Sequence, residues 1–121
     1  MQPHQVAVYG TLKRGLPNHG YMRGARFMGD DWLTDITLYD LGYFPGAKLE
    51  PSGGIHVEIY QIDDSTLVAL DRLEGYRPEQ HELSLYHRVL LSSRFGTTWV
   101  YVYNHDVDDL PVIRQGAWSL R

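Results

Sequence analysis

The chain has 121 residues, a formal net charge of -4 and no cysteine. This length suits one domain, so we predict a single domain over residues 1–121. The lack of cysteine excludes disulfides, thiolate metal sites and cysteine nucleophiles. The acidic balance argues against nucleic acid as the main partner and favours a small polar ligand.

The sequence shows no sign of a membrane or a secretory route. No run approaches the roughly 20 apolar residues that a membrane helix needs. The first ten residues, MQPHQVAVYG, lack the basic and apolar regions of a signal peptide. We therefore expect a cytoplasmic protein with no membrane partner.

Five runs rich in β-branched and aromatic residues are predicted to be strands, at 5–9, 32–39, 55–62, 84–92 and 97–103. The last run has large apolar side chains on both faces, so we expect both faces to be covered. This pattern predicts a closed or strongly curled sheet. EPSGG at 50–54 is predicted to be a hairpin loop, and a short helix is expected near Pro17 or Asn18.

One clear helix is predicted at about 65–74, in DDSTLVALDRLEGY. Asp64 or Ser65 can cap its start, and Gly75 can adopt the left-handed conformation that ends it. Its apolar stripe consists of Leu67, Leu70 and Leu73. Glu74 lies on or beside this stripe, so its carboxylate is predicted to point toward the core side.

VYGTLKRGLPNHG contains G-x-x-x-x-G, but LP follows where a phosphate loop requires K and S or T, so nucleotide binding is not predicted. Gly10 lacks a side chain and Thr11 is small, so the turn can present backbone N–H groups to an anion or an oxyanion. The alternative is an ordinary tight turn with solvated basic side chains at Lys13 and Arg14.

Glu74 ends the predicted helix, where the macrodipole and burial both disfavour a negative charge. A raised pKa would suit a general base. The alternative is a surface glutamate in a salt bridge with Arg72, Arg77 or Arg88.

Other chemistries have little support. The six histidines include no i, i+4 pair, so no metal site is predicted. No G-x-S-x-G occurs, and the paired aspartates are typical of turns and caps. Tyr86 and Arg88 share one face of a predicted strand, where they can line a pocket or where Arg88 can pair with an acid.

VYGTLKRGLPNHG, LDRLEGY and YHRVLL together resemble the γ-glutamylcyclotransferase-like family, which includes the γ-glutamylamine cyclotransferases and AIG2-like proteins. The order, spacing and chain length match over nearly the whole chain. The resemblance implies an α+β fold, a small mixed β-barrel with few short helices. It also implies release of 5-oxoproline and a free amine from a γ-glutamyl amine or γ-glutamyl amino acid, with no cofactor.

The resemblance also implies roles for particular residues. Glu74 matches the catalytic glutamate, a general acid and base, of the L-D-x-x-E-G segment. The turn implied to bind substrate consists of Tyr9, Gly10, Thr11 and Leu12. Tyr86 and Arg88 match a Y-x-R segment and are expected to line the pocket or support Glu74. A non-catalytic ligand-binding or interaction module of the same fold is the alternative.

Two features depart from the family pattern. Val57 stands where a glycine is common, which can change pocket width or strand pairing. Trp118 adds an aromatic side chain near the end of the chain, as a lid or as a packed end. The sequence leaves the particular γ-glutamyl compound and the oligomeric state open.

Overall fold

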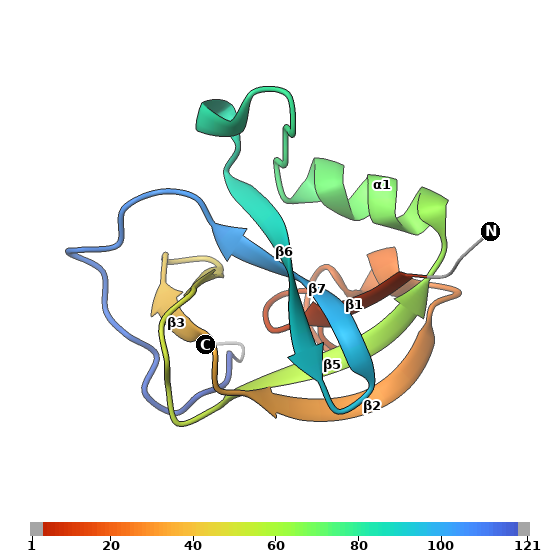
Figure 1. Ribbon diagram of the computed structural model, residues 1–121, viewed down its shortest axis with the longest axis horizontal. Coiled ribbons are helices and arrows are strands. Elements are labelled where there is room, and N and C mark those ends of the chain that lie inside the picture. The colour runs from red at the N-terminus through yellow and green to blue at the C-terminus, as the bar shows by residue number, and fades with distance from the viewer. Residues whose placement is uncertain (1–3, 119–121) are drawn as a thin grey trace.

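The computed structural model describes residues 4–118 (Figure 1). Its regular elements are, in chain order, β1 His4–Val8, the 3-10 helix η1 His19–Met22, β2 Arg26–Leu33, β3 Thr37–Asp40, β4 Pro45–Lys48, β5 Ile55–Ile62, α1 Asp64–Leu73, the 3-10 helix η2 His81–Leu83, β6 Tyr86–Ser93 and β7 Gly96–Tyr103. None of the helices in this part of the chain is long and apolar enough to cross a membrane.

The main sheet has five strands in the order β2-β5-β1-β7-β6, and β3 and β4 form a separate pair. The central strands β1 and β7 run parallel, and the other neighbours run antiparallel. The predicted α+β class is confirmed, but the predicted barrel is wrong. The sheet curls and stays open, because β3 and β4 hydrogen-bond to each other and not to its edge strands β2 and β6 (Figure 1).

Most predicted elements lie close to where the sequence places them. The strand at 55–62 and the helix are confirmed within one residue at each end, and η1 follows Asn18 directly. The predicted strand at 32–39 is wrong, because it combines the end of β2 with most of β3. The loop at 50–54 joins β4 to β5, which belong to different sheets, so it is not a hairpin loop. The sequence did not predict β4.

Two hydrophobic clusters lie on opposite faces of the main sheet. One lies between the sheet and α1 and includes Val6, Val8, Tyr60, Leu67 and Leu70. The other lies against β3, β4 and the segment after β7 and includes Leu38, Val57, Ile59, Val100 and Trp118. Side chains of β5 alternate between the two clusters, so this strand is covered on both faces.

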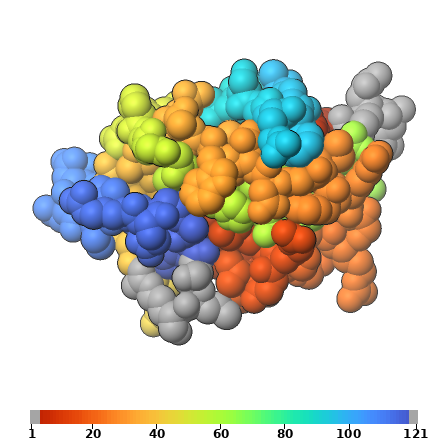
Figure 2. Space-filling view, turned by 90° about the horizontal axis from the view of Figure 1, so that it is seen from below, coloured from red at the N-terminus to blue at the C-terminus, as the bar shows by residue number. Residues whose placement is uncertain are grey.

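The segment after β7 packs against the second cluster. Figure 2 shows it in blue beside β2, which crosses the same face in orange. Trp118 is buried in this cluster. The aromatic residue of the tail is therefore a packed end and not a lid.

Both ends of α1 have defined caps. Asp63 accepts the Thr66 backbone N–H at 2.8 Å, so the N-cap lies one residue before the predicted positions. Gly75 has φ +66° directly after the C-cap residue Glu74, as predicted. These caps fix where the helix stops and hence where the Glu74 side chain leaves it.

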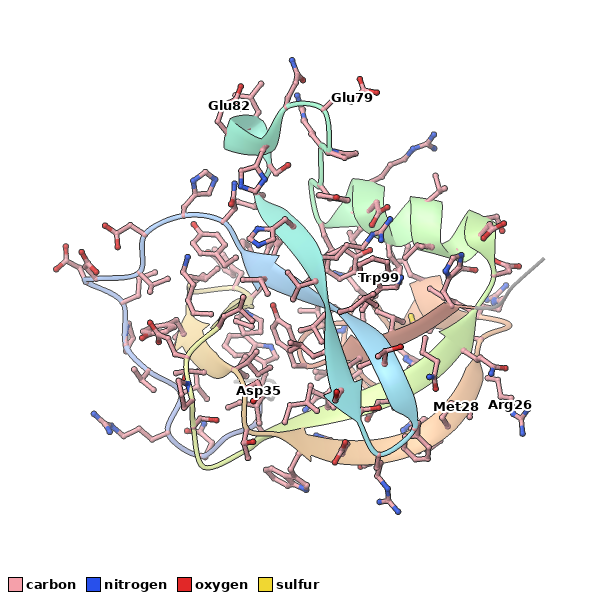
Figure 3. All side chains as sticks on the ribbon, viewed as in Figure 1. Arg26, Met28, Asp35, Glu79, Glu82 and Trp99 are labelled. Carbon is pink, nitrogen blue, oxygen red and sulfur yellow. The ribbon has the colours of Figure 1, made fainter. Side chains whose placement is uncertain are left out.

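An ion pair joins α1 to β6. Arg88 donates to both carboxylate oxygens of Asp71, at 2.8 and 3.1 Å, and Tyr101 donates to the same carboxylate at 2.6 Å. The guanidinium also lies 4.2 Å from the centre of the Trp99 ring, on the α1 side of the sheet (Figure 3). The helix turn that carries Glu74 is therefore fixed to the sheet.

Arg88→Met is expected to lower the free energy of unfolding by about 2 kcal/mol, because Asp71 would keep only its Tyr101 partner in a largely desolvated position. Urea denaturation measures this change. Arg72→Met is the matched control, since Arg72 is exposed on the same helix, and it should change stability by less than about 0.5 kcal/mol. Equal effects of the two substitutions would contradict a structural role for the ion pair.

Candidate active site

A cavity of about 490 Å³ lies where the end of β1, the end of α1 and the loop before β4 meet. Its wall contains Ala7, Val8, Tyr9, Gly10, Thr11, Leu12, Pro17, Asn18, Tyr43, Phe44, Pro45, Leu73, Glu74, Leu85, Tyr86 and Tyr101. The fold thus brings together Glu74, Tyr86 and the turn at 9–12, which the sequence analysis singled out. Arg88 does not line the cavity.

Glu74 is partly buried at the C-cap of α1 and faces this cavity. Burial raises the pKa of its carboxyl group from 4.5 to about 7. No cationic side chain in residues 4–118 forms a salt bridge with it, and Arg88 pairs with Asp71 instead. The alternative of a salt-bridged surface glutamate is therefore wrong, and the side chain has the acidity of a group that exchanges protons near neutral pH.

The turn after β1 is closed by its own hydrogen bonds. The Lys13 N–H donates to the Gly10 carbonyl at 3.0 Å, and Asn18 donates to the Thr11 carbonyl and to its hydroxyl, each at 2.9 Å. Within the described part of the chain, no hydrogen bond occupies the backbone N–H of Gly10, Thr11 or Leu12. All three residues belong to the cavity wall. Neighbouring backbone N–H groups without a protein partner can bind an anion or a polarised carbonyl.

The two basic residues of this turn differ in exposure. The Lys13 side chain is buried, so the expectation of a solvated side chain is wrong there, whereas the Arg14 side chain is exposed and pairs with the Glu58 carboxylate at 3.4 Å. Lys13 is buried, and its ammonium donates to His56 Nδ1 at 3.2 Å while His56 Nε2 donates to Asp30 at 2.7 Å. The Arg14 backbone N–H donates to the buried Glu58 carboxylate at 2.9 Å. These contacts tie the turn to β5 and β2 behind the cavity.

Tyr9 and Tyr86 contribute their rings to the cavity wall, because their hydroxyls already have backbone partners. The Tyr9 hydroxyl donates to the Tyr101 carbonyl at 2.6 Å and accepts the Ala47 N–H at 3.2 Å. The Tyr86 hydroxyl donates to the Pro45 carbonyl at 2.6 Å. Burial raises the pKa of both phenols far above the usual value. Both phenols are therefore neutral, and their hydroxyls link β4 to the main sheet.

Sequence reasoning missed one side of the cavity. The loop before β4 supplies Tyr43, Phe44 and Pro45, and Leu85 faces the cavity from the segment before β6. The only local signal was the GYFPGA stretch, whose glycines and proline are typical of a turn or an edge strand. Val57 lies in the second core cluster and not in the cavity wall, so it does not change the width of this cavity directly.

Comparisons with known proteins show which family the chain belongs to. Residues 6–120 match the family described as gamma-glutamyl cyclotransferase, AIG2-like. The gamma-glutamylcyclotransferase family protein YtfP of Escherichia coli strain K12 is 37% identical over 114 residues, which cover 94% of this chain and 95% of that protein. The gamma-L-glutamyl-butirosin B gamma-glutamyl cyclotransferase of Niallia circulans is 35% identical over 104 residues, with 82% and 66% covered.

Solved structures show the same fold. The solution structure of Escherichia coli ytfP has a TM-score of 0.73 at 37% identity, with 94% of this chain and 95% of that chain covered. The crystal structure of an AIG2-like protein from Mus musculus has a TM-score of 0.79 at 25% identity, with 98% and 90% covered. The family match and the shared fold therefore place the protein in the AIG2-like class. The chain belongs to the γ-glutamyl cyclotransferase family, as the sequence predicted.

Gly10→Ala is expected to displace β4 from the cavity wall. A methyl group at residue 10 would lie 2.9 Å from Cγ and 3.1 Å from Cδ of Pro45, which is closer than carbon atoms pack. We expect a loss of about 1–3 kcal/mol in the free energy of unfolding, measured by urea denaturation. Gly20→Ala is the control, because no atom lies within 4 Å of the added methyl group. Equal stability of the two variants would contradict this packing.

Glu74→Gln is expected to stabilise the protein by an amount that grows with pH. Glu74 has a pKa of about 7 when folded against an ordinary 4.5, so the folded state keeps a proton that the unfolded state releases between these values. Parent stability therefore falls as pH rises through this window, whereas glutamine does not ionise. The gain should grow from near zero at about pH 4 to on the order of 3 kcal/mol at about pH 8.

Urea denaturation at both pH values measures this gain. Glu79→Gln is the matched control, because Glu79 projects from the 76–85 segment away from the sheet and is exposed (Figure 3). Its effect should be small and independent of pH. A gain that is the same at both pH values for Glu74→Gln would show that the carboxylate is well solvated.

Proposed function

We propose that this protein is a γ-glutamyl cyclotransferase, which converts a γ-glutamyl amine or γ-glutamyl amino acid into 5-oxoproline and the free amine. One observation carries the proposal: the cavity holds a carboxylate with a pKa near neutrality, beside a turn with unused N–H groups, and residues 4–118 provide neither a cationic partner for the one nor a hydrogen-bond acceptor for the other. A binding module gains nothing from a desolvated, unpaired carboxylate, whereas a proton-transfer site requires one.

The reaction needs one group that first takes a proton and then returns it. The substrate α-amine is mostly protonated at neutral pH, so the Glu74 carboxylate removes a proton and frees the nitrogen lone pair. That nitrogen attacks the γ-carbonyl carbon and closes a five-membered ring. The bond from this carbon to the acylated amine then breaks, and Glu74 delivers its proton to the departing nitrogen. The ring nitrogen still carries two hydrogens and gives up one of them, and the released amine takes up a second proton to become an ammonium ion. Two protons thus leave the α-ammonium group and two arrive on the released amine. Atoms and electrons balance without an oxidant or a reductant.

The turn at 10–12 supports the charge that develops during this reaction. Attack converts the γ-carbonyl oxygen into an oxyanion, which unused backbone N–H groups can stabilise. The same donors suit the α-carboxylate of the glutamyl group. Because the nucleophile and the electrophile belong to one molecule, the protein mainly has to hold the glutamyl chain in a folded conformer. The buried rings of Tyr9 and Tyr86 limit the space for that conformer.

Arg88 has a positioning role in this proposal. It contacts Asp71 and Trp99, not the cavity, so it acts through the helix turn that ends at Glu74. Tyr101 connects the Asp71–Arg88 ion pair to the cavity, because its hydroxyl donates to Asp71 and the residue forms part of the cavity wall. The resemblance allowed two roles for Arg88, lining the pocket or supporting Glu74. Because Arg88 does not line the cavity, the proposal gives it the second role.

Release of 5-oxoproline from a panel of γ-glutamyl amides and dipeptides tests the proposal. Glu74→Gln is expected to lower kcat/KM by at least about a hundredfold, the effect of losing one general acid and base. In the parent, kcat/KM should fall about tenfold per pH unit below about 7, because protonated Glu74 cannot accept a proton. Glu82→Gln, at an exposed residue of the same segment as Glu79, should keep parental activity (Figure 3).

Two results would count against this activity. Full activity in Glu74→Gln would exclude Glu74 as the base. Tight binding of a γ-glutamyl amide to well-folded parent protein without product release would favour a non-catalytic binding module. Calorimetric titration of parent and Glu74→Gln protein with the same amide separates binding from turnover.

A further inference from the structure

The cavity wall divides into a buried floor and an exposed rim. On the floor, Tyr9, Leu12 and Tyr86 are at most 6% exposed. At the rim, Tyr43 is 94% exposed, Phe44 37% and Leu85 36%. Pro17, on the side of the turn, is also exposed at the rim. A ligand whose reacting carbonyl reaches Glu74 and the turn therefore extends outward through an opening bordered by apolar side chains, among them Tyr43, Phe44 and Leu85.

The rim is attached to the elements that build the catalytic floor. On one side, the Leu41 N–H donates to the Phe44 carbonyl at 3.1 Å, and the Phe44 ring centre lies 6.5 Å from that of Tyr86. On the other side, the Leu85 N–H donates to the Gly75 carbonyl at 3.0 Å, directly after Glu74. Phe44 thus lies against Tyr86 of the floor, and Leu85 is bonded to the residue that follows Glu74.

The cavity has its only charged side chain, Glu74, on the inner side, and the described residues at its opening are uncharged. Among the cavity-lining residues, all of which belong to the described part of the chain, Glu74 has the only charged side chain. The unused N–H groups of the turn can hold the single α-carboxylate of the glutamyl group. A second carboxylate, carried by the leaving amine, would meet apolar side chains and the negative charge of Glu74, with no cation to pair with.

We propose that Tyr43, Phe44 and Leu85 form the subsite for the leaving amine and select amines that have an apolar body and no carboxylate. This inference rests on the cyclotransferase activity proposed above and narrows its substrate class. Aromatic and aliphatic side chains at the opening bury an apolar amine favourably. An amino acid leaving group of the same shape is disfavoured by its carboxylate alone.

Three matched substrates separate the two effects. γ-Glutamyl-phenethylamide and γ-glutamyl-phenylalanine differ only in the carboxylate of the leaving group, and γ-glutamyl-methylamide lacks the apolar body. We expect kcat/KM for the phenethylamide to exceed that of each of the other two by at least about tenfold, measured as 5-oxoproline release by the parent protein.

Variants at the rim test which residues cause the preference. Phe44→Ala should lower the ratio of kcat/KM for the phenethylamide to kcat/KM for the methylamide several-fold, toward one. Leu85→Arg places a cation at the opening, where it can pair with the leaving-group carboxylate. It should therefore raise the ratio of kcat/KM for the phenylalanine compound to kcat/KM for the phenethylamide at least about tenfold. Leu90→Ala and Leu90→Arg are the matched controls, because Leu90 is exposed on β6 outside the cavity. Both controls should keep the parental ratios.

The outcomes separate this inference from the activity on which it rests. Release of 5-oxoproline with equal or faster turnover of the phenylalanine compound would overturn the apolar subsite and leave the cyclotransferase standing. Parental ratios in both Phe44→Ala and Leu85→Arg would also overturn the subsite. Failure of the folded parent to release 5-oxoproline from all three compounds would count against the activity and the subsite together.

Discussion

The hydroxyl of Tyr9 holds together the parts of the fold that enclose the cavity. It donates to the Tyr101 carbonyl of β7 and accepts the Ala47 N–H of β4, so one buried oxygen joins the end of β1 to both sheets. Because a buried hydroxyl is costly without such partners, β4 stays close to the turn. Gly10 then packs against Pro45 with no room for a side chain. The floor of the cavity depends on this contact.

The carboxylates near the cavity differ in whether a cationic side chain pairs with them. Behind the turn, Glu58 binds Arg14, and at the helix Asp71 binds Arg88, so these carboxylates have cationic partners. Glu74 is partly buried and has no such partner among residues 4–118, and burial raises the pKa of its carboxyl group. The helix caps and the Asp71 ion pair hold this unfavourable carboxylate in place. Stability supplied by the neighbouring contacts thus permits a side chain that by itself destabilises the folded state.

The errors of sequence reasoning have identifiable physical causes. β4 contains Pro45 and Gly46, residue types depleted in strands, and it forms because β3 pairs with it and the two tyrosine hydroxyls bind it. Lys13 follows a glycine turn and has the composition of a solvated residue, yet its partner His56 comes from β5. Local pattern cannot reveal such partners, because each lies far along the chain.

The sequence by itself determined the helix with its terminal Gly75, the strand at 55–62, the glycine turn and the placement of Glu74 beside the apolar stripe. These features follow from residue periodicity and backbone conformation, which act over a few neighbouring residues. Only the tertiary structure decided that the sheet stays open, that Arg88 binds Asp71 and not Glu74, and that Phe44 and Leu85 flank the cavity. Each of these depends on contacts between distant segments, which form only when the whole chain packs.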